Sequence, residues 1–173
     1  MSGQFSKTTF FQHTETYTSL LQMNRNHLFK SDLGRFSVFE RNVQGINTKP
    51  QFTNASLSDS EITSMISKDD IIFGGKANGS VFTYNNDNYN EEFIFQNKEQ
   101  INCVDFYENT FIATTNNSTK ILNLTKELGM ITFDVVKTLD KGFKIAKFNP
   151  NASKLVAYKE GEPGKYYFLD PIT

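Results

Sequence analysis

The chain has 173 residues, of which 38% are hydrophobic, and its 18 basic and 19 acidic side chains leave a net charge of -1. This length suggests a single domain, and the nearly balanced, scattered charges give no electrostatic footprint for nucleic acid. No segment approaches the roughly 18 apolar residues that a membrane-spanning helix needs, and the polar start of the chain lacks the apolar run of a secretory signal.

Cysteine usage indicates a reduced compartment. Cys103 is the single cysteine of the chain, so no disulfide can form within it. We therefore expect a cytoplasmic protein, with the nucleus as the alternative location.

The first elements are short. Residues 1–16 show no apolar periodicity, which predicts a flexible N-terminal tail before a domain over 17–173. Within 17–40, the run LFKSDLGRFSVFE predicts a strand, a turn and a second strand. The polar segment 41–60 that follows is expected to hold one outer strand and an extended surface loop.

The segment 59–68, DSEITSMISK, fits two structures. A short helix would place Ile62, Met65 and Ile66 on one face. A strand, ITSMIS, would lead directly into the apolar run that follows. The local pattern leaves both open.

The stretch 69–85, DDIIFGGKANGSVFTYN, predicts a β-hairpin. Two short runs of β-branched and aromatic residues suit half-buried strands. Between them, Gly74, Gly75 and Gly79 are interpreted as structural turn residues that supply the backbone freedom of a tight reversal.

The same pattern recurs along the chain. IIFG at 71–74 aligns with FIAT at 111–114, and a third copy runs over 143–170. The segment 61–66 falls beside 100–106, which contains NCVDF and is rich in β-formers, so this comparison favours the strand over the helix. EEFIFQ and GMITFDVV, between the copies, suit a fourth strand.

Four short strands about every 40 to 44 residues is the period of a propeller blade. The sequence therefore predicts an all-β, WD-repeat-like partial β-propeller of about three to four four-stranded blades that does not close. The blade copies lie near 17–40, 61–96, 100–136 and 143–170.

Little in the sequence suggests catalysis. A Cys103 thiolate would need a basic partner, and the two histidines lie in the N-terminal region, so a buried structural cysteine is favoured. One Cys and two His make no metal-ligand set. The pair Asp69-Asp70 is interpreted as turn formers. We expect a protein that is not an enzyme and has no metal or cofactor.

Loops at one rim of the blades are the candidate binding surface. They comprise the turns between second and third strands and the turn that leads into a first strand. Such loops are polar and not constrained by the repeat; for each residue, a turn that merely faces solvent is the alternative. The candidate partner-binding residues are Lys76, Asn78, Asn97, Lys98, Asn116, Asn117, Lys159 and Glu160.

Three stretches of the chain resemble F-box/WD-repeat proteins of the dactylin type. They are LLQMNRNHLFKSDLGRFSVFER at 20–41, SKDDIIFGGKANGSVFTY at 67–84 and KEQINCVDFYENTFIATTNNSTKILNL at 98–124. The copies depart from the usual WD repeat, because Tyr84-Asn85 and Leu122-Asn123 stand where Trp-Asp is usual. No histidine follows His27, so the usual His–Asp network cannot form.

The resemblance implies the substrate receptor of a Skp1–cullin–F-box ubiquitin ligase, whose F-box binds Skp1 while the propeller holds the protein to be ubiquitinated. Fewer than 20 residues precede the resembling segment, too few for an F-box. We therefore expect a fragment, a short isoform or a relative without the ligase connection. The alternative function is a truncated or remnant WD-repeat scaffold protein.

The partners expected are proteins, not nucleic acid or membranes. An open array of blades leaves two apolar faces and free sheet edges. Completion by another chain is therefore among the expectations.

Overall fold

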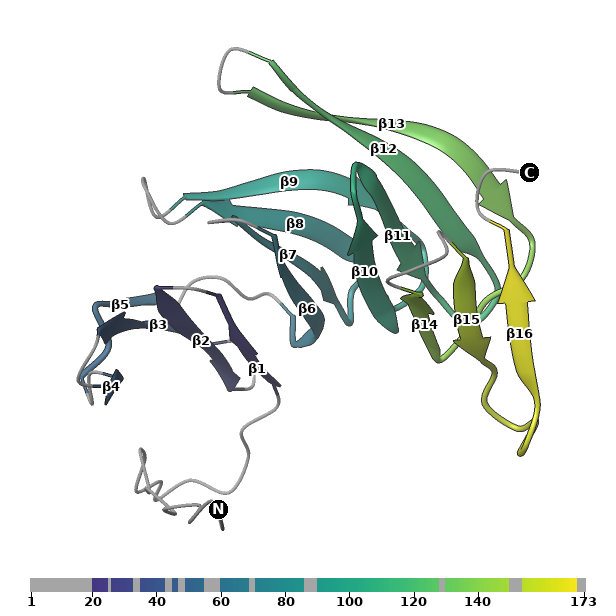
Figure 1. The fold of residues 1–173 in the computed structure, drawn as a ribbon. Helices are drawn as coiled ribbons and strands as arrows, with labels where there is room; N and C mark the ends of the chain where they lie inside the picture. The colour runs from purple at the N-terminus through teal and green to yellow at the C-terminus, as the bar shows by residue number, and fades with distance from the viewer. Residues whose placement is uncertain are drawn as a thin grey trace, which may run out of the picture.

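The computed structural model describes residues 20–24, 26–32, 35–42, 45–46, 49–54, 60–68, 71–85, 90–127, 130–149 and 154–170. The predicted tail at 1–16 and the pair Asp69-Asp70 lie outside these residues. The described part consists of strands and their connections, and the prediction of an all-β fold is confirmed. The strands form four antiparallel sheets that follow one another along an arc (Figure 1).

Each sheet takes its strands from consecutive segments of the chain. The first contains β1 (Leu20–Met23), β2 (His27–Asp32), β3 (Arg35–Asn42), β4 (Gly45–Ile46) and β5 (Phe52–Asn54). The second contains β6 (Ile62–Lys68), β7 (Ile71–Lys76), β8 (Ser80–Asn85) and β9 (Asn90–Gln96). The third contains β10 (Cys103–Tyr107), β11 (Thr110–Thr114), β12 (Thr119–Glu127) and β13 (Met130–Leu139). The fourth contains β14 (Ile145–Phe148), β15 (Leu155–Tyr158) and β16 (Tyr166–Leu169).

This arrangement is an open, propeller-like array. The first strands of the sheets, β1, β6, β10 and β14, adjoin one another along the inner side of the arc. The first and last sheets lie at opposite ends of the arc, so the array does not close (Figure 1). The ambiguous segment 59–68 contains strand β6, which pairs antiparallel with β7. In the polar segment 41–60, β5 pairs with β3 as the outer strand.

Because side chains alternate between the two faces of a strand, one sheet contributes to two cores. On β7, Ile72 packs with the first sheet, whereas its neighbour Phe73 packs with the third. On β12, Leu122 faces the second sheet and Ile121 faces the fourth. Successive side chains of a strand point to opposite faces, so each inner sheet is apolar on both sides and requires a neighbour on each.

Aromatic side chains fill much of these cores. The Phe36 ring in the first sheet meets the Tyr84 ring in the second with centroids 4.8 Å apart. The Phe73 ring lies 5.1 Å from the Phe106 ring across the next junction. The Phe and Tyr residues therefore supply bulk in a chain that contains no Trp.

Two of the three glycines interpreted as turn residues lie elsewhere. Gly74 and Gly75 belong to strand β7, while the turn itself is at 77–79. A Cβ at Gly74 would collide with the Phe82 ring, and one at Gly75 would collide with Ile101. Close packing explains these two positions, and Gly79, with φ 88°, is the residue that the turn requires.

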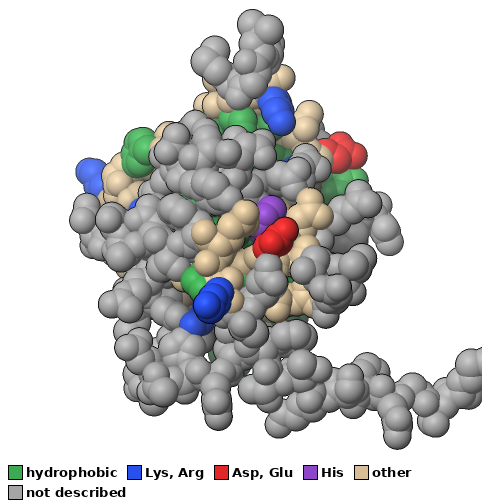
Figure 2. Space-filling view, turned by 90° about the vertical axis from the view of Figure 1, so that its left-hand side faces the viewer, with side chains coloured by type: hydrophobic (Ala, Val, Ile, Leu, Met, Phe, Trp, Pro, Cys, Tyr) green, Lys and Arg blue, Asp and Glu red, His purple; other side chains and the backbone are tan. Residues whose placement is uncertain are grey.

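The surface side chains show no segregation by charge on the face in Figure 2. The described basic and acidic side chains lie apart from one another among polar and hydrophobic ones (Figure 2). This distribution agrees with the net charge of -1. Within the described residues, no helix has the length and apolarity to cross a membrane.

Candidate functional site

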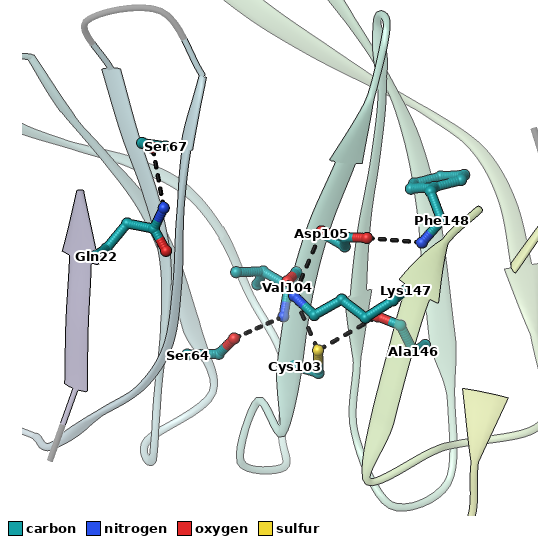
Figure 3. Close-up of polar contacts among 9 residues, drawn as sticks. All are labelled: Gln22, Ser64, Ser67, Cys103, Val104, Asp105, Ala146, Lys147 and Phe148. Atoms are coloured by element: carbon teal, nitrogen blue, oxygen red, sulfur yellow. Dashed lines mark hydrogen bonds and ion pairs between the residues drawn. The ribbon is translucent and has the colours of Figure 1, made fainter. Parts of the chain in front are cut away.

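Hydrogen bonds join the inner strands of neighbouring sheets (Figure 3). Gln22 Nε2 on β1 donates to Ser67 Oγ on β6 at 3.0 Å, and Val104 N on β10 donates to Ser64 Oγ on β6 at 3.0 Å. At the last junction, Asp105 accepts from Phe148 N at 2.7 Å and from Lys147 Nζ at 3.3 Å. Every junction between sheets therefore carries at least one bond of defined geometry.

The connecting loops at one end of the sheets form a continuous rim. We define the rim as residues 77–79, 97–102, 115–118, 140–144 and 159–165. Asn97 N donates to Gly79 O at 2.8 Å. Asn102 Nδ2 donates to Asn116 Oδ1 at 2.7 Å and to Phe143 O at 3.1 Å. Loops of successive sheets are thus bonded to each other, which holds the rim in one conformation.

The tip of the β7–β8 hairpin is ordered by its own side chain. Asn78 Oδ1 accepts a hydrogen bond from Ser80 N at 3.0 Å and another from Ser80 Oγ. Asn78 N donates to Ser60 Oγ at 2.8 Å. Asn78 is exposed, but its side-chain oxygen is occupied in the turn, as is typical of Asn at such positions.

Lys76 does not fit the role of an exposed rim residue. Its side chain is buried, with 7% relative exposure, and its Nζ lies 4.9 Å from the centroid of the Phe82 ring. Lys76 O accepts from Gly79 N and from Ile101 N, both at 3.1 Å. The residue therefore packs under the rim. Its position at a strand end suggested exposure, but the loop 97–102 lies against it.

The other candidates divide between two parts of the rim. Lys98, Asn116 and Asn117 are exposed, and Asn97 is half-buried. At the far end, Lys159 is half-buried and Glu160 is exposed, with Glu160 Oε2 3.5 Å from Lys144 Nζ.

Between the second and third sheets, the rim is hollowed into an open depression of about 250 Å³, the rim depression. One wall comes from the loop after β9 and the other from the turn between β11 and β12. The lining residues are Asn97, Lys98, Glu99, Thr115, Asn117 and Ser118. The structure thus brings three predicted residues together, Asn97, Lys98 and Asn117.

Glu99 is the charged centre of the rim depression. Asn117 Nδ2 donates to Glu99 Oε1 across the depression. Hydrogen bonds from Asn117 and Thr115 lower the pKa of Glu99, because they favour its charged form. The carboxylate is therefore ionised at neutral pH.

Two residues that line the rim depression each have a buried polar atom without a hydrogen-bond partner among the described residues. The atoms are Glu99 Oε2, an acceptor, and Asn97 Nδ2, a donor. Buried polar groups normally find a partner, and leaving one unsatisfied costs about 1–3 kcal/mol. Sequence reasoning selected the turn 97–99, which contains Glu99, but not the bond between Glu99 and Asn117, because Asn117 lies in another loop.

A second depression of about 240 Å³ lies on the inner side of the rim. It is formed at the beginnings of β1 and β6 and by the loops that lead into β10 and β14. The lining residues are Leu20, Glu61, Ile62, Thr63, Gln100, Asn102 and Lys144. The loop 97–102 therefore contributes to both depressions.

Cys103 is buried, as the sequence predicted for a structural cysteine. Its Sγ donates to Ala146 O at 3.3 Å across the last junction between sheets. Among the described residues, no group of three His, Cys, Asp or Glu side chains has the arrangement of a metal site.

The comparisons with known proteins concern the fold alone. No protein-family model and no curated protein matches the chain. The computationally designed Ika4 protein is similar in structure, with a TM-score of 0.69 and 14% sequence identity over 91% of this chain and 92% of Ika4. The designed Ika8 protein is also similar, with a TM-score of 0.67 and 14% identity over 88% of this chain but 45% of Ika8.

Proposed function

We propose that this chain is a non-catalytic protein-interaction module that holds a partner protein at its rim. The observation that carries the proposal is the open polar rim depression, whose lining includes the exposed side chains of Lys98 and Asn117. An extended peptide segment of the partner would lie across the depression, against Lys98 and Asn117. Exposed Lys98 and Asn116 would contact neighbouring side chains of the partner.

The rim supports such a role in two further ways. Bonds between loops of successive sheets hold it rigid, and a rigid surface loses less conformational entropy when a partner binds. The depression is polar and open, which suits a chain segment that lies across it rather than a small molecule enclosed in an apolar pocket.

The finer proposal is that the module is the substrate-holding part of a Skp1–cullin–F-box ubiquitin ligase. Its support is the resemblance of 67–84 and 98–124 to F-box/WD-repeat proteins of the dactylin type, because these two stretches contain the rim loops 77–79 and 115–118 and residues 98–102 of a third. A WD-repeat scaffold protein without a ligase connection is the alternative.

The test is a quantitative pull-down from cell lysate, read by mass spectrometry, with three forms of the tagged chain. The rim variant carries Lys98→Ala, Asn116→Ala and Glu160→Ala, all at exposed positions. The control variant carries Asn123→Ala, Lys126→Ala and Asp134→Ala, which are exposed on β12 and β13. The wild type and the control variant should capture the same amount of the same partner. The rim variant should capture at least tenfold less of it.

Equal loss in both variants, or no specific partner for a folded chain, would contradict the proposal. Skp1 and a cullin in the captured set would support the ligase role. Their absence from a well-folded sample that still binds a partner at the rim would leave the scaffold function.

A further inference from the structure

The tip of the β7–β8 hairpin contains the only Asn-Gly step of the chain, Asn78-Gly79. The Cγ of an Asn side chain can be attacked by the backbone nitrogen of the next residue. A glycine in the next position leaves that nitrogen unshielded, because it has no Cβ. Asn78 is exposed, so water and hydroxide reach the site. The step therefore has the residue types and the access that spontaneous modification of Asn requires.

Two donors converge on the side-chain oxygen of Asn78. Asn78 Oδ1 accepts from Ser80 N at 3.0 Å and also from Ser80 Oγ. The backbone N–H of Ser80 can only donate, which identifies the atom that faces it as the carbonyl oxygen of the amide. Attack on Cγ moves negative charge onto this oxygen. Donors already placed there stabilise the tetrahedral intermediate in the same way as an oxyanion hole.

The backbone of the same turn slows the reaction. The attacking atom, Gly79 N, donates to Lys76 O at 3.1 Å, and Gly79 O accepts from Asn97 N at 2.8 Å. The nitrogen must leave Lys76 O and lose its proton before it can attack. Exposed loops open locally at a small cost in free energy. The contact with the loop after β9 therefore sets how often the nitrogen is released.

We propose that Asn78 is a site of spontaneous deamidation, and that the two donors of Ser80 promote the reaction. Gly79 N forms a bond to Asn78 Cγ and gives up its proton, the bond from Cγ to Nδ2 breaks, and ammonia leaves. The resulting succinimide takes up one water molecule at either of its carbonyl carbons. Ring opening then gives aspartate or isoaspartate at position 78, and no oxidant or other co-reactant is needed.

The isoaspartate product would disturb the rim, because its main chain runs through the former side-chain carbon and is one atom longer. Asn78 N donates to Ser60 Oγ at 2.8 Å, and Asn78 O accepts from Gln96 Nε2 at 2.5 Å. Both bonds require the normal spacing of the backbone, so hydrogen exchange at 97–102 should quicken as isoaspartate accumulates. The modification does not depend on whether the rim binds a partner.

Asn117, which precedes Ser118 in the same rim, is the internal reference. It is also exposed, and Ser118 N is likewise held, since it donates to Thr115 Oγ1 at 3.0 Å. The Asn117 side chain donates through Nδ2 to Glu99, however, and the residue after it has a Cβ. The native full chain is incubated at neutral pH and body temperature, and peptide mapping by mass spectrometry measures deamidation at both sites. Asn78 should react at least tenfold faster than Asn117.

Ser80→Ala separates the effect of the turn from that of the Asn-Gly step itself. It removes the Oγ donor and leaves the step intact. In the native chain, Ser80→Ala should slow deamidation of Asn78 at least threefold, whereas in urea the unfolded variant and wild type should react at the same rate. Thr138→Ala, at an exposed position on β13, is the control and should leave the native rate unchanged.

Deamidation of Asn78 no faster than that of Asn117 in the native chain would overturn the proposal. A native Ser80→Ala chain that reacts as fast as the wild type, or faster, would overturn it too, because the donors would then not promote the reaction. Equal slowing by Ser80→Ala in the native and the unfolded chain would also contradict it, since the effect would come from the sequence and not from the turn.

Discussion

Two neighbouring side chains hold Glu99 in its charged form, so the stability of the folded chain should depend on pH through this residue. Hydrogen bonds from Asn117 and Thr115 lower the pKa of this carboxyl group below its ordinary value. A group whose pKa is lower in the folded state contributes stability above its unfolded pKa, and that contribution is lost as pH falls through the folded pKa.

Replacing Asn117 tests this directly. Asn117→Ala removes the largest cause of the shift, so the pKa of Glu99 should rise towards its ordinary value, as measured by NMR titration of the Glu99 side chain. In the same acidic range, Glu99→Gln should make the free energy of unfolding less dependent on pH than in the wild type. An unchanged Glu99 titration in Asn117→Ala would contradict this account.

Alanine substitutions at two glycines with positive φ can distinguish the cost of backbone strain from the cost of steric crowding. Gly79 has φ 88° and Gly161 has φ 83°, but a Cβ at Gly79 would meet Asn97 O and, at 2.7 Å, Glu99 O, whereas space at Gly161 is open. Gly161→Ala should therefore cost about 1 kcal/mol of unfolding free energy, for strain alone. Gly79→Ala should cost about 3 kcal/mol, because strain and a backbone collision combine. Chemical denaturation measures both, and equal losses would show that the loops are not in contact.

At the scale of elements, the junctions between sheets depend on polar groups that the inner strands bury. Asp105 is 6% exposed on β10 and accepts from Phe148 N at 2.7 Å and Lys147 Nζ at 3.3 Å on β14. The carboxylate therefore links the third sheet to the fourth where their apolar cores also meet.

Removing this carboxylate should loosen the last sheet. Asp105→Ala leaves the N–H of Phe148 without its partner, and we expect a loss of about 2 kcal/mol in unfolding free energy. Amide hydrogen exchange should also quicken in β14–β16 before the other sheets. Asp134→Ala, at an exposed position on β13, is the control and should change the free energy by less than about 0.5 kcal/mol. Equal effects would show that Asp105 has no special role.

The elements were predictable where the information is local or repeated. The hairpin of β7 and β8 follows from short β-branched and aromatic runs on either side of a turn. Strand β6 was ambiguous by itself and was resolved by comparison with 100–106, because repeated units share one fold.

The other features of the fold and of the rim depend on tertiary contacts, which the local sequence pattern does not encode. Gly74 is required by the Phe82 ring on the next strand and not by a turn. Lys76 is buried because a loop more than 20 residues later lies on it. The Glu99–Asn117 bond joins residues 18 positions apart, so the two loops could be selected from the sequence, but the bond between them could not.

At the scale of the molecule, the exposed apolar face of the last sheet should favour association. Ile145, Tyr166 and Phe168 are 51%, 65% and 73% exposed on this face, and exposed apolar patches promote association. Phe168→Glu should therefore reduce the concentration dependence of light scattering, whereas Asp134→Ala, at an exposed position on β13, should leave it unchanged. Equal scattering by the wild type and Phe168→Glu would contradict this expectation.

We propose the rim as the surface at which this chain binds a partner protein. The most direct measurement places a photo-crosslinking amino acid at Lys98, in the rim depression, and in a second chain at Asp134, on the outer strand β13. Both positions are exposed, so both chains should fold alike. We expect irradiation in cells to yield a defined adduct with another protein from position 98 and none from position 134. Adducts from position 134 alone, or identical adducts from both, would contradict it.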